Sequence, residues 1–214
     1  MATTNSKVEI CNIALALLGE DSIRAFDEKN KRARMADVFF DFTRDYLLAK
    51  FDWPFARKFV KLQPLAATQM KMTVPQGKFV YELPADCHTP RDIHPPGSKD
   101  RWHVMGWQLY CDIDPKSDRD VYLYYTSAAL DPRYYSHTFS NLVALGLAVK
   151  MCPAITQDKA LTAALMEQFN IEQQNAWESE ANIGEDYRAH DEDPNNDTFV
   201  NPDGYWEDEE LRIK

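Results

Sequence analysis

The sequence predicts an α+β fold: a helical bundle of about four helices, two N-terminal and two C-terminal, interrupted by an antiparallel β-rich insert, plus an extended C-terminal arm. Three observations lead to this prediction. Apolar residues recur at helical spacing in the first 50 residues and again after residue 136. Between these regions apolar and polar residues alternate with the period of a strand. The last residues are acidic and rich in Asn and Pro, which disfavours regular structure.

These patterns divide the chain into three parts. The helical bundle domain is expected to be discontinuous, made of residues 1–56 and 132–181. Residues 57–131 are expected to form the β-rich domain, and residues 182–214 the acidic C-terminal arm. A chain of 214 residues is long enough for a well-buried core in such an arrangement.

The first two helices are predicted from their ends and their apolar faces. Ser6 and Glu9 have the spacing of a capping box, and Gly19 is suited to ending the helix that follows. The second helix is expected to begin at about residues 27–31 and to end at Lys50, which makes it about 30 Å long at 1.5 Å per residue. Its expected apolar face comprises Ala36, Phe39, Phe40, Tyr46 and Leu47.

An aromatic corner separates this helix from the β-rich insert. Phe51, Trp53 and Phe55 surround Pro54. Pro54 has no N–H to offer a helix or a central strand, and it disfavours the helical conformation at Trp53. The helical part is therefore expected to end here, with the rings fixing the direction of the chain.

The insert is expected to contain four to six short antiparallel strands, separated by turns rich in Gly and Pro. The alternating runs lie around Phe59, at Phe79–Leu83, at Trp102–Val104, at Trp107–Cys111 and at Val121–Tyr125. Asp131 and Pro132 close the insert, after which helical spacing returns.

The last two helices are expected to form an antiparallel hairpin. Ser136 can cap a helix that reaches about Met151, and its middle, Leu142–Val149, is apolar on all sides, as in a helix buried inside a bundle. Gly146 in this segment indicates close approach of another helix. Pro153 is expected to break this helix, and Thr156 to cap a final one that carries Leu161, Leu165 and Phe169 and reaches about Ala181.

Composition and charge exclude several classes of protein. No apolar run approaches the roughly 20 residues that a membrane span needs, and no signal peptide is recognisable, so synthesis in the cytoplasm is expected. The four scattered cysteines are expected to be buried, reduced thiols. The formal net charge is −10, and eleven acidic residues against three basic ones place most of it in residues 182–214. A duplex-binding protein would show a basic footprint instead.

The acidic arm carries apolar side chains that a simple solubility tail does not need. They are Tyr187, Phe199, Tyr205, Trp206 and Leu211, with Ile213 beyond them. Aromatic residues spaced along an acidic segment are typical of a chain that becomes ordered on a partner, so we expect the arm to dock. The alternative is a solvated terminus.

Two further groups of residues are candidates for protein contacts. The start of the second helix is basic, with Lys31, Arg32 and Arg34, and it could face the acidic arm of a neighbouring copy. A solvated helix face is the simpler interpretation. The β-rich insert holds more aromatic residues than one small sheet can bury, which indicates an interface at Trp102, Trp107, Tyr122 and Tyr124. Stacking on bases or sugars is a weaker alternative, because basic residues are not interleaved.

The common catalytic and phosphate-binding motifs are absent from the sequence, and no cofactor is expected. Glu20 and Asp21 could form half of a carboxylate pair for glycoside hydrolysis, but acidic residues are also common in a loop after a helix. Cys87 and His88 could bind a metal, yet no second close pair completes a ligand set.

Several motifs resemble those of the tail tubular protein A family, the head-to-tail adaptors of short-tailed bacteriophages. The first is I-x-N-x-A-L-x-x-L-G-E at Ile10–Glu20, followed by Asp45–Leu48 and Trp53–Ala56. The others are Tyr81–Cys87, Val121–Tyr125, Pro132–Phe139 and the segment Leu147–Thr156. Together they cover roughly residues 8–180 in the order that the family shows, whereas the arm matches only in being acidic and irregular.

The resemblance implies a structural virion protein rather than an enzyme. Its copies would form a ring, dodecameric in this family, mounted under the portal after DNA packaging in the host cytoplasm. The ring would contact the tail nozzle protein and the tail fibres and would let viral DNA pass without sequence-specific binding. A negatively charged lumen suits that passage because it repels phosphate. By the same resemblance, the acidic arm would reach the portal and the aromatic β-rich part would face the nozzle or a sister subunit.

Two functions from other classes remain as alternatives. A phage neck-associated cell-wall hydrolase would use paired carboxylates in a groove, and peptidoglycan lysis would reveal it. A DNA-end-binding module would retain linear duplex in a salt-sensitive way.

Overall fold

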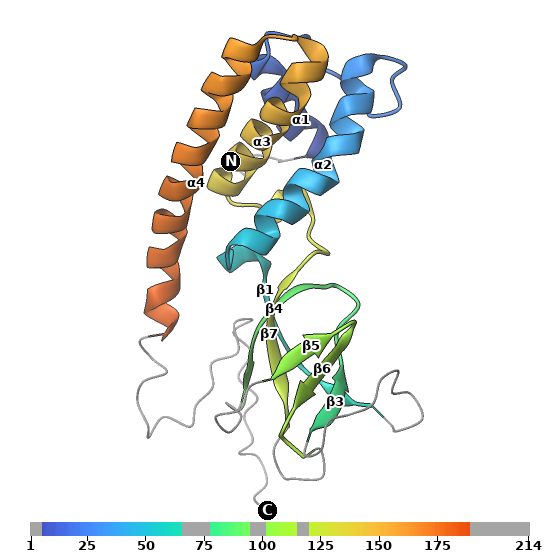
Figure 1. Cartoon of the computed structure of the whole chain (residues 1–214), viewed down its shortest axis with the longest axis vertical. Helices are drawn as coiled ribbons and strands as arrows, with labels where there is room; N and C mark the ends of the chain where they lie inside the picture. Colours follow the sequence, from blue (N-terminus) through green and yellow to red (C-terminus); the bar gives the residue numbers. More distant parts are fainter. Residues whose placement is uncertain (1–5, 66–77, 95–101, 115–119, 189–214) are drawn as a thin grey trace, which may run out of the picture.

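The computed structural model describes residues 6–65, 78–94, 102–114 and 120–188, with the side chains of residues 182–188 left outside the description. It confirms the predicted α+β class. Within the described residues, four α-helices form one part of the molecule and antiparallel sheets form the other (Figure 1). Two helices precede the strands and two follow them, so the helical part is built from segments far apart in the sequence.

Helices α1 (Lys7–Leu17) and α2 (Lys31–Lys50) have the ends that the sequence predicts. The Ser6 side chain accepts a hydrogen bond from the backbone N–H of Glu9, and the Glu9 carboxylate accepts one from the N–H of Ser6 at 2.7 Å. Gly19 adopts a φ of +70°, a conformation that favours glycine, just beyond the end of α1. Asn30 caps α2 by accepting from the N–H of Ala33 at 2.7 Å.

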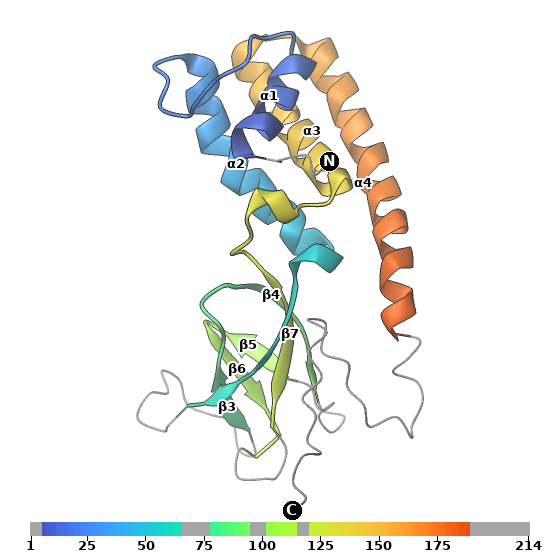
Figure 2. The same cartoon turned by 180° about the vertical axis from the view of Figure 1, so that it is seen from behind.

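Helix α3 (His137–Ile155) is the centre of the helical part. Ser136 caps it as predicted, accepting from the N–H of Phe139 at 3.2 Å. Its middle is buried on every side, and it packs against α1, α2 and α4, as the two opposite views agree (Figures 1 and 2). In the described part of the chain it is the one helix long and apolar enough to cross a membrane, and 61% of its apolar window is buried within the protein. That burial is what the core helix of a bundle shows.

Gly146 lies at a close contact between helices, as its place in the sequence predicted. A Cβ atom added there would lie 2.8 Å from Cγ2 of Thr43 on α2 and 3.2 Å from the Phe169 ring on α4. Contacts this short leave no room for a side chain, because protein interiors are close-packed. The absence of a side chain at Gly146 therefore lets three helices meet.

Two predictions about the hairpin between α3 and α4 (Lys159–Arg188) are wrong. Pro153 lies inside the last turn of α3, where it removes only one hydrogen bond, and the helix continues to Ile155. Thr156 ends α3 instead of starting α4, since its N–H donates to the carbonyl of Cys152 at 3.0 Å. Asp158 caps α4, accepting from the N–H groups of Ala160 and Leu161 at 2.8 and 3.0 Å.

Helix α4 is also longer than predicted. We expected it to end at about Ala181 and the irregular arm to begin at Asn182, but the helix continues to Arg188. Gly184 costs about 1 kcal/mol of helix propensity relative to Ala. The first residue that would strongly oppose a helix is Pro194, and nothing before it forces an end. The part of the arm before Arg188 is therefore helical backbone.

The aromatic corner has the predicted form. Trp53 is fully buried, and its indole N–H donates to the carbonyl of Leu47 at 2.8 Å. Its ring packs edge-on against Phe51 and Phe139, with centroids 5.3 and 4.8 Å away. A short 3-10 helix, η1 (Pro54–Ala56), then leads into the first strand. The corner thus ties the end of α2 to the start of α3.

The β part has two antiparallel sheets. The first has the order β1 (Arg57–Lys61), β7 (Tyr122–Ser127), β4 (Cys87–His94). The second has the order β2 (Gln63–Pro64), β3 (Phe79–Glu82), β6 (Gln108–Cys111), β5 (His103–Met105). These seven strands exceed the four to six expected, even within the described residues alone. Their apolar residues form a core separate from that of the helices.

Strand β4 is the element that the sequence did not predict, although it is the longest strand among the described residues. Pro90 lies within it, and proline in a run of residues argues against a strand. The structure accommodates Pro90 because β4 is the edge strand of its sheet and because its register with β7 shifts just after this residue. Edges and bulges are where a missing N–H does least harm.

Arg91 of β4 joins the two parts of the molecule. Its guanidinium donates to the carbonyls of Leu48 and Phe51 at the end of α2, at 3.0 and 2.7 Å, and to the Thr126 hydroxyl on β7 at 2.9 Å. Burial lowers the pKa of Arg91. A cation at a helix C-terminus satisfies otherwise unpaired carbonyls and complements the helix dipole. This contact therefore fixes α2 on the first sheet.

Candidate interaction surfaces

The proposed arm lies almost wholly beyond the described residues. Phe199, Tyr205, Trp206 and Leu211 are outside them. Tyr187 belongs to the last turn of α4, and its side chain is not described. The position of α4 shows where the chain leaves the helical part. In Figure 1 the lower end of α4 lies at the level of the β part.

The basic start of α2 is only partly available for a partner. Arg32 bridges Glu20 and Asp21 at 3.2 and 3.0 Å, and the hydrogen bond that its guanidinium donates to Asp21 is the main cause that raises the Arg32 pKa. The Lys31 ammonium donates to the carbonyl of Ala154 at the end of α3. Arg34 is exposed. Two of the three predicted residues thus hold this end of the bundle together.

These contacts also involve Glu20 and Asp21, the two carboxylates that were considered for glycoside hydrolysis. Glu20 and Asp21 lie in the loop after α1, and both bind one arginine. The two carboxylates share one guanidinium, so this loop holds an ion-pair cluster within the chain. In the part of the chain that the structure describes, no three His, Cys, Asp or Glu side chains come together in a way that could hold a metal ion.

The four cysteines are free and buried, as predicted. Burial raises the pKa of the Cys11 thiol to about 12 and that of Cys87 to about 11. At neutral pH these groups are protonated, so they act as small apolar side chains in the two cores.

The four aromatic residues proposed for the β part do not form one surface. Trp107, in the turn between β5 and β6, is 68% exposed. Trp102 packs against the second core, and Tyr122 stacks on Phe59 with ring centroids 5.1 Å apart. The Tyr124 hydroxyl donates to the Asp52 carboxylate at 3.1 Å. Of the four, Trp107 is the exposed side chain, and the other three are partly buried.

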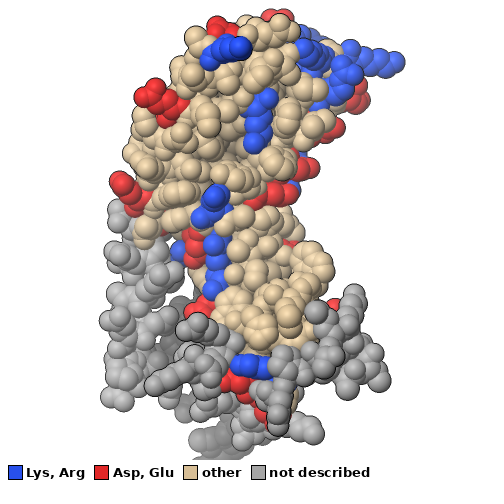
Figure 3. All heavy atoms as spheres, in the orientation of Figure 1, with Lys and Arg blue, Asp and Glu red and all other residues tan. Residues whose placement is uncertain are grey.

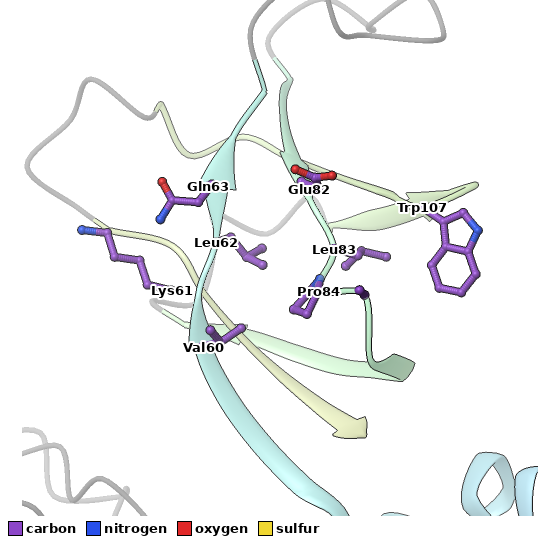
Figure 4. Close-up of a pocket in the computed structure, with 9 residues that line it drawn as sticks. Val60, Lys61, Leu62, Gln63, Glu82, Leu83, Pro84 and Trp107 are labelled. Carbon is purple, nitrogen blue, oxygen red and sulfur yellow. The ribbon is translucent and has the colours of Figure 1, made fainter. Parts of the chain in front are cut away.

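Trp107 borders an open cavity of about 600 Å³ on the β part. The cavity lies where the strand running from β1 into β2 diverges from the segment after β3. Its apolar lining comes from Val60, Leu62, Leu83, Pro84, Ala85 and Trp107. Figure 4 shows Lys61 and Gln63 on the opposite side of their strand from Val60 and Leu62. Lys61, Gln63 and Glu82 also line the hollow, so its lining is mixed, with a tryptophan at its rim.

A further exposed surface lies on α2, and the sequence reasoning missed it. Val38, Phe42 and Tyr46 are 59%, 62% and 43% exposed, although Tyr46 was expected to face the core. The Lys150 ammonium of α3 lies 4.8 Å from the centroid of the Phe42 ring, and that of Lys50 lies 5.2 Å from the Tyr46 ring. We call these five residues the α2–α3 face. The signal for it was the spacing of four that Val38, Phe42 and Tyr46 share, on a different side of the helix from Phe40 and Leu47.

Figure 3 shows how charge is distributed over this side of the molecule. Uncharged residues cover most of the surface over α3 and α4, basic side chains gather at the upper end of α2, and acidic side chains lie along the outer edges of both α4 and α2. Contiguous exposed apolar patches mark sites of interaction, whereas single exposed apolar side chains are common on protein surfaces.

Comparison of the chain with models of known protein families finds no match, and comparison with curated proteins finds no relative.

Proposed function

We propose that the chain is a structural virion protein, the subunit of a head-to-tail adaptor ring that joins the portal to the tail nozzle of a short-tailed bacteriophage and forms part of its DNA channel. The ordered motifs of residues 8–180 support this assignment. The function is assembly, with no catalysis and no cofactor, and it is carried out in the virion neck after synthesis in the host cytoplasm.

The observation that carries the proposal is the exposed apolar row on α2. Burying one Phe or Leu side chain stabilises a contact by about 1.5–3 kcal/mol. Val38, Phe42 and Tyr46 leave such surface in water in the single chain. An assembling subunit keeps this surface for its neighbours, because the same groups would otherwise favour burial in its own core.

The joint between the two parts supports the same function. Trp53 and Arg91 fix the β part to the end of α2. A subunit held in this way can contact sister subunits through its helices while it presents Trp107 to the nozzle or to another copy. The acidic arm, which follows α4, is assigned to the portal, where its aromatic residues become ordered on contact.

The test is binding to purified portal from the cognate phage, measured by size-exclusion chromatography with light scattering. The full chain should elute with the portal, with several copies per particle. A variant that ends at Arg188 keeps the whole of α4 and should retain its thermal melting temperature but lose portal binding. Normal portal binding by this variant would remove the role assigned to the arm, and a full chain that never binds portal would contradict the proposed function.

A further inference from the structure

The outer side of α4 has the properties that complement the α2–α3 face. Glu167, Ile171, Gln174 and Glu178 are all exposed, and their spacing places them in one row along the helix. We call this row the α4 face. Ile171 is 54% exposed. Small exposed residues, Ala160, Ala163 and Ala164, precede this row on the same helix.

The two faces carry opposite charge. Between residues 160 and 181, α4 has four glutamates and no lysine or arginine. On α3, Lys150 is the one lysine or arginine, and Lys50 lies in the last turn of α2. Within the described residues neither lysine has a carboxylate within 4 Å, and neither do Glu167 and Glu178. The α2–α3 face thus combines three large apolar side chains with two lysines, and the α4 face combines one, Ile171, with two glutamates.

We propose that the α2–α3 face of one copy binds the α4 face of the next copy. The proposal rests on the adaptor function, and it names the surfaces through which the ring closes. Phe42 and Tyr46 of one subunit pack against Ile171 and the neighbouring alanines, which allow close approach of the helices. Lys50 and Lys150 pair with Glu167 and Glu178 at the rim of this contact.

The positions of the faces explain why such a contact makes a ring. Helices α2 and α4 lie at opposite edges of the helical part, with α3 between them (Figures 1 and 2). A contact between two different faces leaves one face of each kind free at the ends of any open chain of subunits. Repetition of this contact closes into a ring when the rotation between subunits allows it, whereas a self-complementary face would stop at a dimer.

Charge reversal tests the contact in the full chain. Lys50→Glu/Lys150→Glu places acidic groups on both faces, and Glu167→Lys/Glu178→Lys places basic groups on both. We expect each double variant alone to assemble on portal at least roughly tenfold less well than the wild type, because like charges meet at the contact. An equimolar mixture of the two should restore assembly, since an acidic face then meets a basic one at every junction.

Two controls separate this result from a general loss of stability. Lys50→Arg/Lys150→Arg keeps both charges and should assemble as the wild type does. All variants should keep the wild-type melting temperature, because none of the four positions is buried.

The outcomes also separate this contact from the proposed function. If the wild type forms rings on portal and the double variants do so equally well, or if the mixture fails to recover, the contact is wrong while the adaptor function stands. If the wild type never assembles with portal, the adaptor function and the contact both fall.

Discussion

At the scale of single residues, Gly146 decides how closely the helices pack. We expect Gly146→Ala to destabilise the protein, because the new methyl group would meet Thr43 Cγ2 at 2.8 Å and the Phe169 ring at 3.2 Å. Overpacking of this kind costs about 1–3 kcal/mol, against a gain of about 1 kcal/mol in helix propensity. The free energy of unfolding from urea titrations measures the balance.

The double variant Thr43→Ser/Gly146→Ala is the matched control, because Thr43→Ser removes the Cγ2 methyl group that the new alanine would contact. The two changes should be non-additive, with part of the loss recovered. Additive effects, or a stabilised Gly146→Ala variant, would show that the helices do not meet at this residue as described.

Asp86 is the residue at which stability should depend on pH. Its carboxylate accepts from Lys58, Ser127 and Tyr125 at 2.6, 2.8 and 3.0 Å. Burial alone would raise the pKa of Asp86, but these hydrogen bonds outweigh it and the pKa is lowered. A carboxyl with a lowered pKa in the folded state stabilises the protein above the unfolded value of about 3.9. This stabilisation is lost as the pH falls through the folded-state pKa.

We therefore expect Asp86→Asn to cost about 1–3 kcal/mol at pH 7, because it replaces a carboxylate that accepts from two hydroxyls of buried residues and from the partly exposed Lys58 ammonium. The difference from the wild type should shrink as the pH is lowered through the acid range. Urea titrations of both proteins at pH 7 and in acid give the comparison, and a difference that is unchanged or larger in acid would contradict this role for Asp86.

At the scale of elements, Arg91 holds α2 against the first sheet. Arg91→Ala should lower the free energy of unfolding by about 2–4 kcal/mol, since it leaves the Leu48 and Phe51 carbonyls without their donor in a largely buried site. Arg133→Ala is the matched control. Its side chain is 63% exposed and pairs with Asp131, so its removal should change stability by less than about 0.5 kcal/mol. If both variants lost the same free energy of unfolding, Arg91 would not be holding α2 against the first sheet.

The sequence predicted elements well where their ends are local. The caps at Ser6 and Ser136 and the corner at Trp53 depend on contacts within a few residues, and all were found. The prediction failed at prolines whose surroundings in the fold outweigh the local preference of proline against helix and strand. Pro153 is tolerated near a helix end, so that helix was predicted too short, and β4, which holds Pro90 at a sheet edge, was not predicted. Tertiary context of this kind is not encoded in a short window of sequence.

At the scale of the whole molecule, the candidate surfaces were less predictable than the fold. Charge and aromatic content indicated the basic helix start and the β-rich part, but composition does not show which side chains are already engaged. Arg32 and Tyr124 make contacts within the chain. The apolar row of the α2–α3 face could have been found from the spacing of Val38, Phe42 and Tyr46, but Lys150 comes from a distant segment and joins it only in the fold.

The molecule as a whole has two separate apolar cores, one joint and exposed apolar surface at the edges of its helical part. This organisation suits a rigid subunit that is incomplete without neighbours.

Electron microscopy of the purified full chain mixed with its cognate portal tests the central claim most directly. The account predicts a closed ring of several copies seated on one end of the portal, with an open channel along its axis and the α2–α3 and α4 faces at each subunit boundary. Portal particles that remain bare, beside a chain that stays monomeric, would contradict it.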